Sequence, residues 1–271
     1  MTTSPWERKV VEHFDKGAHS YGNSYEGDSS SSYFFTTRQR IIISRLNRLA
    51  GGRLLDVACG PGLMAAPCGS RGFRYFGIDI SHGMIVECRA RSGNLPGAQF
   101  SVGKMQKLPF ADDYFDVLLC MGGLEYIPAA EELDARREMI RVVKPGGTLM
   151  ISHLNRHSPY WLWRRFVYRW LRLCLDLARF PIAGPFSARP RGHAVHDVPI
   201  RLFTERSSRR VLEGSPVAIA ETLYYAFNVF LSPLDSRFPH LSNRVSKKLE
   251  CLRNSPLKWL AMAFIMVLTK N

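Results

Sequence analysis

An acidic residue inside an apolar run, followed by a glycine-rich turn, is the pattern with the most chemical content in this chain. Residues 54–62 are LLDVACGPG, so that Asp56 precedes Gly60 and Gly62. Glycine lets the backbone pass close to a ligand, and a helix that follows offers free N–H groups to an anion. Asp79 ends the next apolar run, where a carboxylate can accept hydrogen bonds from two ribose hydroxyls. Together the two elements indicate a nucleotide cofactor site.

Apolar runs of strand length alternate with segments of helical period around these residues. The predicted strands are 54–58, 73–80, 98–102, 115–121 and 148–153, and the predicted helices are 33–50, 61–70, one capped by Ser81, and 131–143. Because such alternation forms right-handed βαβ units, we expect a doubly wound α/β fold with a mainly parallel sheet. Two late runs, 215–225 and 259–269, with a helix at 241–252 between them, bring the predicted sheet to seven strands.

Composition divides the chain into four predicted parts. Residues 1–50 form an N-terminal helical cap, within which the Gly- and Ser-rich segment 15–32 is expected to be mobile. Residues 51–154 form the cofactor-binding core. A helical insertion after the fifth strand, 155–214, is expected to act as a lid over the substrate, and 215–271 supply the last two strands.

Five segments together carry a family resemblance. The segments are LLDVACGPG, FGIDIS with Met84 soon after, LPFADDYFDVLLC, LEYI and RVVKPGGTLMIS. Their order and spacing resemble those of class I S-adenosylmethionine-dependent methyltransferases. The chain looks most like the subgroup of ubiquinone/menaquinone biosynthesis enzymes and natural-product methyltransferases, over about residues 40–153. The resemblance implies a Rossmann-like methyltransferase fold, S-adenosylmethionine as the cofactor and S-adenosylhomocysteine as the product.

The resemblance also implies which residues contact the cofactor. Asp56 reaches the methionine moiety, Asp79 holds the ribose, and Met105 and Gln106 lie at the adenine edge. Further residues flank the adenine, let the backbone approach, or lie beside the sulfonium. The full expected set is Tyr21, Asp56, Ala58, Gly60, Gly62, Asp79, Ile80, Met84, Met105, Gln106, Cys120 and Met121.

The chain departs from the family pattern at three positions. Ala58 replaces the first loop glycine, and Tyr126 replaces the family histidine after Leu124-Glu125. The acidic residue usually found after the third strand is missing, and Lys104 stands there instead. Because an ammonium group has no acceptor, Lys104 cannot accept a hydrogen bond from the adenine amine. A backbone carbonyl or Gln106 is expected to take over that role.

Transfer to a hydroxyl acceptor also needs a group that removes a proton, whereas transfer to a carboxylate does not. The candidate bases are His153, Glu125, His193 and His196. His153 has the best topological position, because ligands bind at the carboxyl ends of parallel strands. For each of the four, a structural or surface role is the alternative.

The basic charge of the chain is concentrated in its second half. Residues 1–150 carry 18 Lys and Arg against 16 Asp and Glu, whereas residues 151–271 carry 19 against 7. The segment 160–180 resembles a basic amphipathic helix rich in Trp, which suits a lid over an apolar pocket or a peripheral membrane contact. An ordinary helix docked on the core, with its arginines in water, is the alternative.

Two other function classes would also fit a basic chain with a cofactor loop. The basic half could serve an RNA or other nucleic-acid methyltransferase, but the chain lacks an Asn/Asp-Pro-Pro-aromatic motif and a Pro-Cys motif. A cofactor-binding protein without catalysis is the third class. The six cysteines form no CxxC pair and no His cluster has zinc spacing, so we expect no metal. No secretory signal or spanning segment is evident, which favours a cytoplasmic protein.

The sequence therefore predicts an enzyme that methylates a lipophilic small molecule, with an anionic acceptor left open. Oxygen is the first choice of acceptor atom, followed by carbon and nitrogen. A homodimer is also left open.

Overall fold

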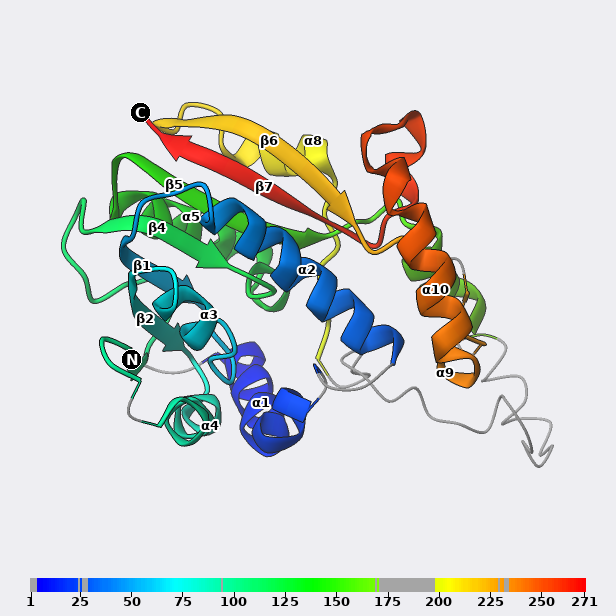
Figure 1. Ribbon diagram of the computed structural model, residues 1–271, viewed down its shortest axis with the longest axis horizontal. Coiled ribbons are helices and arrows are strands. Elements are labelled where there is room, and N and C mark those ends of the chain that lie inside the picture. The colour runs from blue at the N-terminus through cyan, green and yellow to red at the C-terminus, as the bar shows by residue number, and fades with distance from the viewer. Residues whose placement is uncertain are drawn as a thin grey trace.

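The structure is a computed structural model that describes residues 4–23, 25, 29–93, 95–168, 170, 198–228, 230–231 and 234–271. Its centre is one seven-stranded sheet in the order β3-β2-β1-β4-β5-β7-β6 (Figure 1). The strands are β1 Gly52–Val57, β2 Phe73–Asp79, β3 Gln99–Val102, β4 Phe115–Cys120, β5 Val143–Leu154, β6 Val217–Tyr225 and β7 Ala263–Lys270. The first five strands pair in parallel, and β7 is antiparallel to both of its neighbours. This confirms the predicted, mainly parallel α/β sheet. The sheet is mixed, because β7 runs antiparallel to β5 and β6.

Helices cover both faces of the sheet, with α2, α3 and α10 on one face and α5 and α8 on the other (Figure 1). The helices are α1 Pro5–Asn23, α2 Ser30–Leu46, α3 Ala65–Gly69, α4 His82–Ser92, α5 Glu132–Arg141, α6 Pro159–Leu162, α8 Glu205–Val211, α9 Leu234–Arg237 and α10 Pro239–Leu249. Short 3-10 segments are η1 Leu124–Tyr126, η2 Ala129–Glu131, η4 Glu250–Asn254 and η5 Pro256–Leu260, and Trp163–Tyr168 (η3) is π-helical.

The core consists of two layers because strand side chains alternate between the faces. Leu54 of β1 packs in the cluster that contains Ile42 of α2. Its neighbour Leu55 packs in the other cluster, with Ala135 and Met139 of α5. Each fully buried leucine contributes about 1.5–3 kcal/mol relative to an exposed one. Apolar burial on both faces explains why the central strands are continuous apolar runs in the sequence.

The Gly- and Ser-rich segment 15–32 is helical over most of its described part. Helix α1 continues to Asn23, and α2 begins at Ser30. Asp15 of α1 accepts hydrogen bonds from Ser81 Oγ at 2.5 Å and from the Gly83 N–H at 2.8 Å, and Ala18 is buried. Tertiary contacts therefore stabilise a helix that the local composition disfavours.

Three further element boundaries differ from the predicted ones. Helix α3 starts only at Ala65, because Gly60 and Gly62 before it have left-handed φ values of +54° and +73°. Strand β5 starts at Val143, since the predicted turn before residue 148 forms an irregularity within the pairing with β4. Strand β7 starts at Ala263, after the 3-10 segment η5.

Part of the predicted lid helix at 160–180 lies outside the described residues. Helix α6 and the π-helical segment η3 follow Ser158, so the described beginning is helical. The division into cap, core, lid and last strands stays a prediction. Within the part of the chain that the structure describes, no helix is both long enough and apolar enough to cross a membrane.

Candidate functional site

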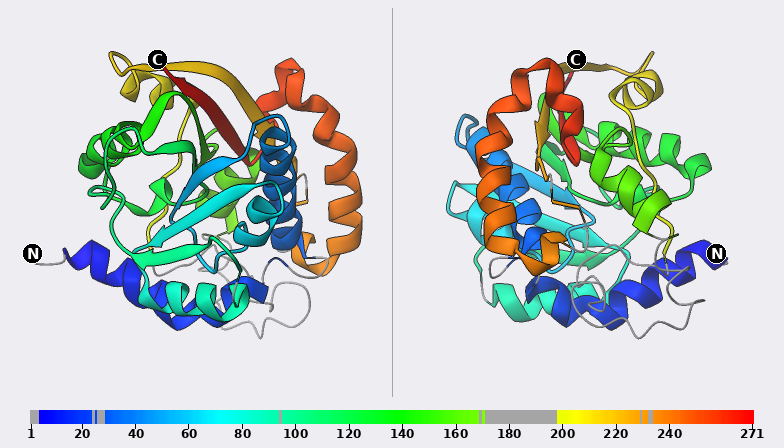
Figure 2. Two further views of the ribbon diagram at one scale, coloured as in Figure 1. Left: turned by 60° about the vertical axis from the view of Figure 1, so that its left-hand side comes forward. Right: turned by 90° about the vertical axis from the view of Figure 1, so that its right-hand side faces the viewer.

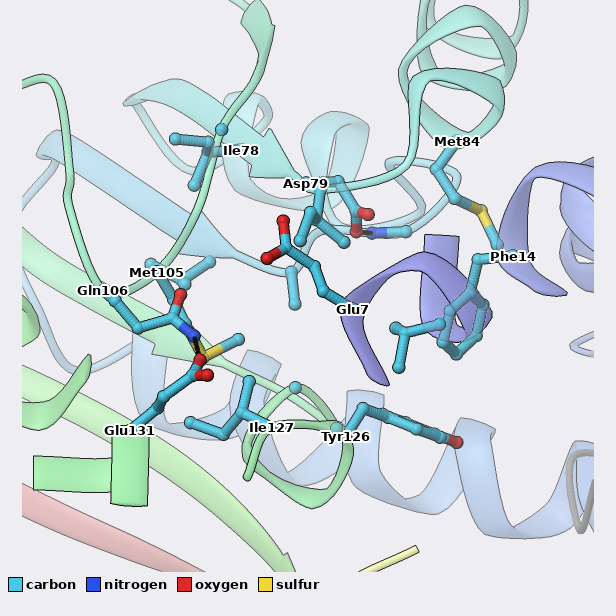
Figure 3. Close-up of a pocket in the computed structure, with 18 of the residues that line it drawn as sticks. Glu7, Phe14, Ile78, Asp79, Met84, Met105, Gln106, Tyr126, Ile127 and Glu131 are labelled. Atoms are coloured by element: carbon cyan, nitrogen blue, oxygen red, sulfur yellow. Dashed lines mark hydrogen bonds between the residues drawn. The ribbon is translucent and has the colours of Figure 1, made fainter. Parts of the chain in front are cut away.

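A pocket at the carboxyl ends of β1, β2 and β4 gathers most of the predicted cofactor residues. It encloses about 790 Å³, part of it open to solvent, and we call it the main pocket (Figure 3). The predicted residues that line it come from five separate segments of the chain. They are Tyr21, Ala58, Gly60, Asp79, Ile80, Met84, Met105, Gln106 and Met121.

The glycine-rich loop after β1 forms one wall of the main pocket. Ala58, the residue that replaces the family glycine, has a φ of +59°, so the loop keeps a left-handed conformation without glycine. Gly60 lines the pocket with a φ of +54°. Gly62 does not line it; a Cβ there would lie 3.0 Å from Cys88 Sγ, so close packing explains this glycine. The loop as a whole exposes backbone to the pocket.

Asp79 links this loop to the start of α4. Its Oδ2 accepts a 2.9 Å hydrogen bond from the Gly60 N–H, and its Oδ1 accepts one of 2.9 Å from the Ser81 N–H. The Ser81 hydroxyl in turn accepts from the Met84 N–H at 3.0 Å, which confirms Ser81 as the N-cap of α4. Burial raises the pKa of Asp79 to about 6, against the opposing effect of the two backbone hydrogen bonds.

A second, smaller cavity of about 450 Å³ adjoins the main pocket and shares Tyr21, Ala58, Gly60 and Met121 with it. We call it the side pocket. Asp56 lines it, and so do Arg38 and Gln39 of α2. Tyr75 donates a 2.6 Å hydrogen bond to Asp56 Oδ2, whereas the buried Oδ1 has no partner among the described residues. The side pocket thus offers a carboxylate acceptor opposite a guanidinium donor.

Helix α1 closes the main pocket from the N-terminal side, which the sequence analysis missed. Trp6, Glu7, Val10 and Phe14 line the pocket, and α1 lies beside α4 (Figure 2). The Trp6 indole donates to the carbonyl of Tyr126 at 2.7 Å. The spacing of Trp6, Val10 and Phe14 by four residues is the helical signal that could have identified this wall.

Aromatic and aliphatic side chains form the wall opposite the loop. Phe14 and Tyr126 pack edge to face with ring centroids 4.9 Å apart, and Ile127 and Pro128 continue this wall. Tyr21 lies 6.0 Å from Phe14, between centroids. The main pocket therefore combines a polar end at Asp79 with an apolar wall.

His153 lines neither pocket, so its position at the end of a strand does not make it a base for a ligand bound there. The ring is fully buried and stacks on Phe264 at a centroid distance of 5.0 Å. Arg136 Nη2 donates to His153 Nε2 at 2.8 Å, so that nitrogen cannot take a proton from a ligand. Burial and the Arg136 charge lower the pKa of His153 well below its ordinary value. A strand end marks where ligands bind, but here the side chain faces the core.

Glu125 remains the best-placed candidate base among the described residues. It lies in η1, between Gly123 and Tyr126 of the pocket wall, but it is only 2% exposed and does not itself line either pocket. Its Oε2 has no partner among the described residues, and burial raises the pKa of its carboxyl to about 7. Cys120 is buried behind the same wall and lines neither pocket. His193 and His196 lie outside the described residues.

The comparisons with known proteins agree with this geometry. Residues 55–151 match the family model described as a methyltransferase domain. A demethylmenaquinone methyltransferase of Paenarthrobacter aurescens (strain TC1) is 30% identical over 168 residues, which cover 62% of each chain. The chain thus spans less than two thirds of the length of that curated relative.

Solved structures with the same fold extend over the whole chain. The 1,6-didemethyltoxoflavin-N1-methyltransferase of Burkholderia thailandensis, solved with S-adenosylhomocysteine, superposes with a TM-score of 0.59 at 14% identity, covering 100% of this chain and 91% of that one. The [4+2]-cyclase SpnF superposes with a TM-score of 0.60 at 17% identity, covering 100% and 97%. Since these two proteins are named for different reactions, the fold alone does not fix the chemistry.

Proposed function

Because the chain belongs to the class I S-adenosylmethionine-dependent methyltransferases of the ubiquinone/menaquinone type, we propose that it methylates an oxygen atom of a lipophilic small molecule. The observation that carries this proposal is the main pocket, in which the cofactor-type residues at the strand ends face an apolar wall around Phe14 and Tyr126. S-adenosylmethionine is the cofactor and supplies the methyl group when bound.

The nucleoside end of the cofactor fits the region around Asp79. Each carboxylate oxygen of Asp79 already accepts one backbone hydrogen bond, and each has a further acceptor position for a ribose hydroxyl. Ile80 and Met84 supply apolar surface for the adenine. The left-handed loop at Gly60 leaves room on this side, because only Tyr21 comes within 4 Å of a Cβ built there.

The amino-acid end of the cofactor fits the side pocket. The unpartnered Oδ1 of Asp56 can accept from the ammonium group, and the Arg38 guanidinium can donate to the carboxylate. Arg38 is only 6% exposed, and its Nη2 donates to Tyr25 Oη at 3.0 Å. Buried polar groups of opposite charge, with bonding capacity left, support a zwitterionic ligand.

Glu125 is the group that we propose for removing the acceptor proton. A general base works best when its pKa lies near the working pH, and burial raises the pKa of Glu125 to about 7. Glu125 lines neither pocket in the structure, so this role requires a movement of η1 or a bridging water between its carboxyl and the acceptor. Carbon and nitrogen acceptors are the second and third choices.

A peripheral membrane contact is a further part of this proposal. Phe166 and Val167 of η3 are 56% and 46% exposed, and Trp170 is 66% exposed. Basic residues of the same segment, such as Arg164, suit anionic headgroups. An acceptor dissolved in a membrane would reach the enzyme on this side. A homodimer stays a prediction.

A methyl-transfer assay tests the proposal. Purified protein and labelled S-adenosylmethionine are incubated with hydrophobic phenols, carboxylic acids and isoprenoids, a demethylmenaquinone among them. We expect a methylated product and an equal amount of S-adenosylhomocysteine with at least one acceptor class. Methylation of RNA instead, with binding that collapses as salt rises, would support the nucleic-acid alternative. Cofactor binding with no product from any class would support a protein without methyl-transfer activity.

A further inference from the structure

The carboxylate of Glu7 reaches into the main pocket from helix α1. Its side chain is 18% exposed, and its Oε1 lies 2.5 Å from Lys104 Nζ. Figure 3 shows the carboxylate between Asp79 and Met105, at the end of the pocket that we assign to the nucleoside. Glu7 and Lys104 therefore bring opposite charges together beside that end.

Contacts at the start and in the middle of α1 fix the position of Glu7. Near its start, the Trp6 indole donates to the Tyr126 carbonyl at 2.7 Å. Further along, Asp15 accepts from Ser81 Oγ and from the Gly83 N–H at the beginning of α4. Since α1 is held on two sides of the pocket, the Glu7 carboxylate is presented to a ligand by a rigid element and not by a loop.

Adenine needs an acceptor for its exocyclic amine, and few side chains at this end can supply one. Ile80, Met84 and Met105 line this end and have no oxygen or nitrogen in their side chains, and Lys104, which pairs with Glu7 beside it, is a donor only. The Gln106 amide donates to Glu131 Oε2 at 2.5 Å, and Figure 3 shows this pair farther from Asp79 than the Glu7 carboxylate is. A carboxylate has about four acceptor positions, so the ion pair with Lys104 leaves Glu7 able to accept more.

We propose that Glu7 accepts a hydrogen bond from the adenine amine of the cofactor and that Lys104 positions Glu7 for it. This explains why a cation stands at position 104: Lys104 pairs with an acidic residue of α1, and the loop after β3 supplies no acid at this position. Recognition of the adenine amine therefore depends on the position of α1, since α1 must be in place before Glu7 can reach the amine. The inference rests on the cofactor part of the proposed function and not on the acceptor.

A simpler role for Glu7 would be to fasten α1 to Lys104 without touching the cofactor. The two roles differ in one property. If Glu7 contacts the amine, its removal should weaken binding only of ligands that carry the amine. If Glu7 only fastens α1, its removal should weaken binding of all ligands of the pocket by the same factor.

Calorimetric titration of the full chain distinguishes them. Two ligands are compared, S-adenosylhomocysteine and its analogue with hydrogen in place of the purine 6-amino group. In the unmodified protein we expect the analogue to bind about 10- to 150-fold more weakly, the effect of one hydrogen bond to a charged group. In Glu7→Ala this ratio should fall close to 1, whatever the absolute affinities become.

The controls keep the outcomes apart. Glu12→Ala, on an exposed position of the same helix, should keep the ratio of the unmodified protein. Glu7→Gln replaces Glu7→Ala if the latter does not fold, and should lower the ratio to a few-fold because its amide oxygen is a weaker acceptor. An unchanged ratio in the folded Glu7 variant overturns the inference. Failure of the unmodified protein to bind S-adenosylhomocysteine would instead contradict the cofactor assignment itself.

Discussion

The Tyr75 phenol on β2 donates a 2.6 Å hydrogen bond to Asp56 Oδ2 on β1, and both side chains are buried. This bond engages one oxygen of the carboxylate, while the buried Oδ1 has no partner among the described residues; Asp56 itself lines the side pocket. Burial raises the pKa of Asp56 to about 7, and the Tyr75 bond acts against that rise. Tyr75 therefore helps to keep a buried acceptor ionised for the ligand.

Replacing this phenol should weaken the protein in two measurable ways. We expect Tyr75→Phe to lower the free energy of unfolding by about 1–3 kcal/mol, because it leaves the buried Oδ2 unsatisfied. The affinity for S-adenosylhomocysteine should also fall, since the pKa of Asp56 rises further and less of it is ionised at pH 7. Urea unfolding and calorimetry measure the two effects. Tyr114→Phe, at a half-buried tyrosine outside both pockets, is the matched control.

Asp79 should dominate the binding of the ribose. Losing hydrogen bonds to a charged acceptor costs about 1.5–3 kcal/mol, which corresponds to roughly a 10- to 150-fold weaker Kd. We therefore expect Asp79→Ala to bind S-adenosylhomocysteine that much more weakly while staying folded, by calorimetry and circular dichroism. Unchanged affinity would remove Asp79 from the site, and a gain of affinity for NAD would contradict the family assignment.

The pH dependence of cofactor binding gives an independent test of the same residue. Ribose hydroxyls donate to the ionised carboxylate, and burial raises the pKa of Asp79 to about 6 in the free protein. Binding should therefore release a proton, and the affinity for S-adenosylhomocysteine should decrease as the pH falls from 7 through 6 to 5. Titrations at these pH values in two buffers of different ionisation enthalpy measure both effects. Asp79→Asn should show a flatter profile.

The sequence predicted that the loop residues and Asp79 lie together at one pocket because these residues are near one another in the chain. Asp56 lies near the end of β1, Gly60 lies in the loop that follows, and Asp79 ends β2, so the pairing of neighbouring strands brings them together. The core strands were equally predictable, because strands of a parallel sheet are buried on both faces and therefore form continuous apolar runs between turns.

The other half could not be predicted in this way. Glu7 and Arg38 reach the pockets only because α1 and α2 pack where they do, and no spacing relates them to residue 79. His153 shows the converse error. Its place at a strand end was foreseen correctly, but the alternation of side chains turned it towards Arg136 and the core. Long-range packing decided both cases, and one sequence carries little information about it.

Glu125 should make the stability of the protein fall as the pH rises. Its carboxyl has a pKa of about 7 in the folded state, against an ordinary value of 4.5. The folded state therefore binds the proton more tightly, and this stabilisation is complete below pH 4.5 and is lost as the pH rises through 7. The contribution is roughly 3 kcal/mol at most. Urea unfolding of the cofactor-free protein from pH 4.5 to 8 should show a steeper decline than in Glu125→Gln.

The same variant tests Glu125 as the base. If Glu125 removes the acceptor proton, kcat/KM should rise with pH through about 7 in the unmodified protein. Glu125→Gln should lose about 10²- to 10⁴-fold in kcat, the usual range for a general base, and should also lose the pH dependence. Affinity for S-adenosylhomocysteine serves as the control and should change little. A normal pH profile in the variant would assign the proton transfer to another group.

The exposed aromatic residues after α6 should affect the acceptor and not the cofactor. Phe166 and Trp170 are 56% and 66% exposed and line neither pocket, so their joint replacement by Ala should leave S-adenosylhomocysteine affinity within a factor of a few. Turnover of a lipophilic acceptor should fall more than tenfold if this segment orients the apolar part of that molecule, because remote contacts align the reacting atoms.

Vesicle cosedimentation separates the membrane contact from the lid role. If the segment docks on a membrane, the same double variant should bind both anionic and neutral vesicles more weakly, because it removes apolar surface and no charge. Arg164→Glu should weaken binding to anionic vesicles only, since it removes positive charge and keeps the aromatic surface. A double variant with normal turnover of every acceptor and normal vesicle binding would leave the segment a structural role alone.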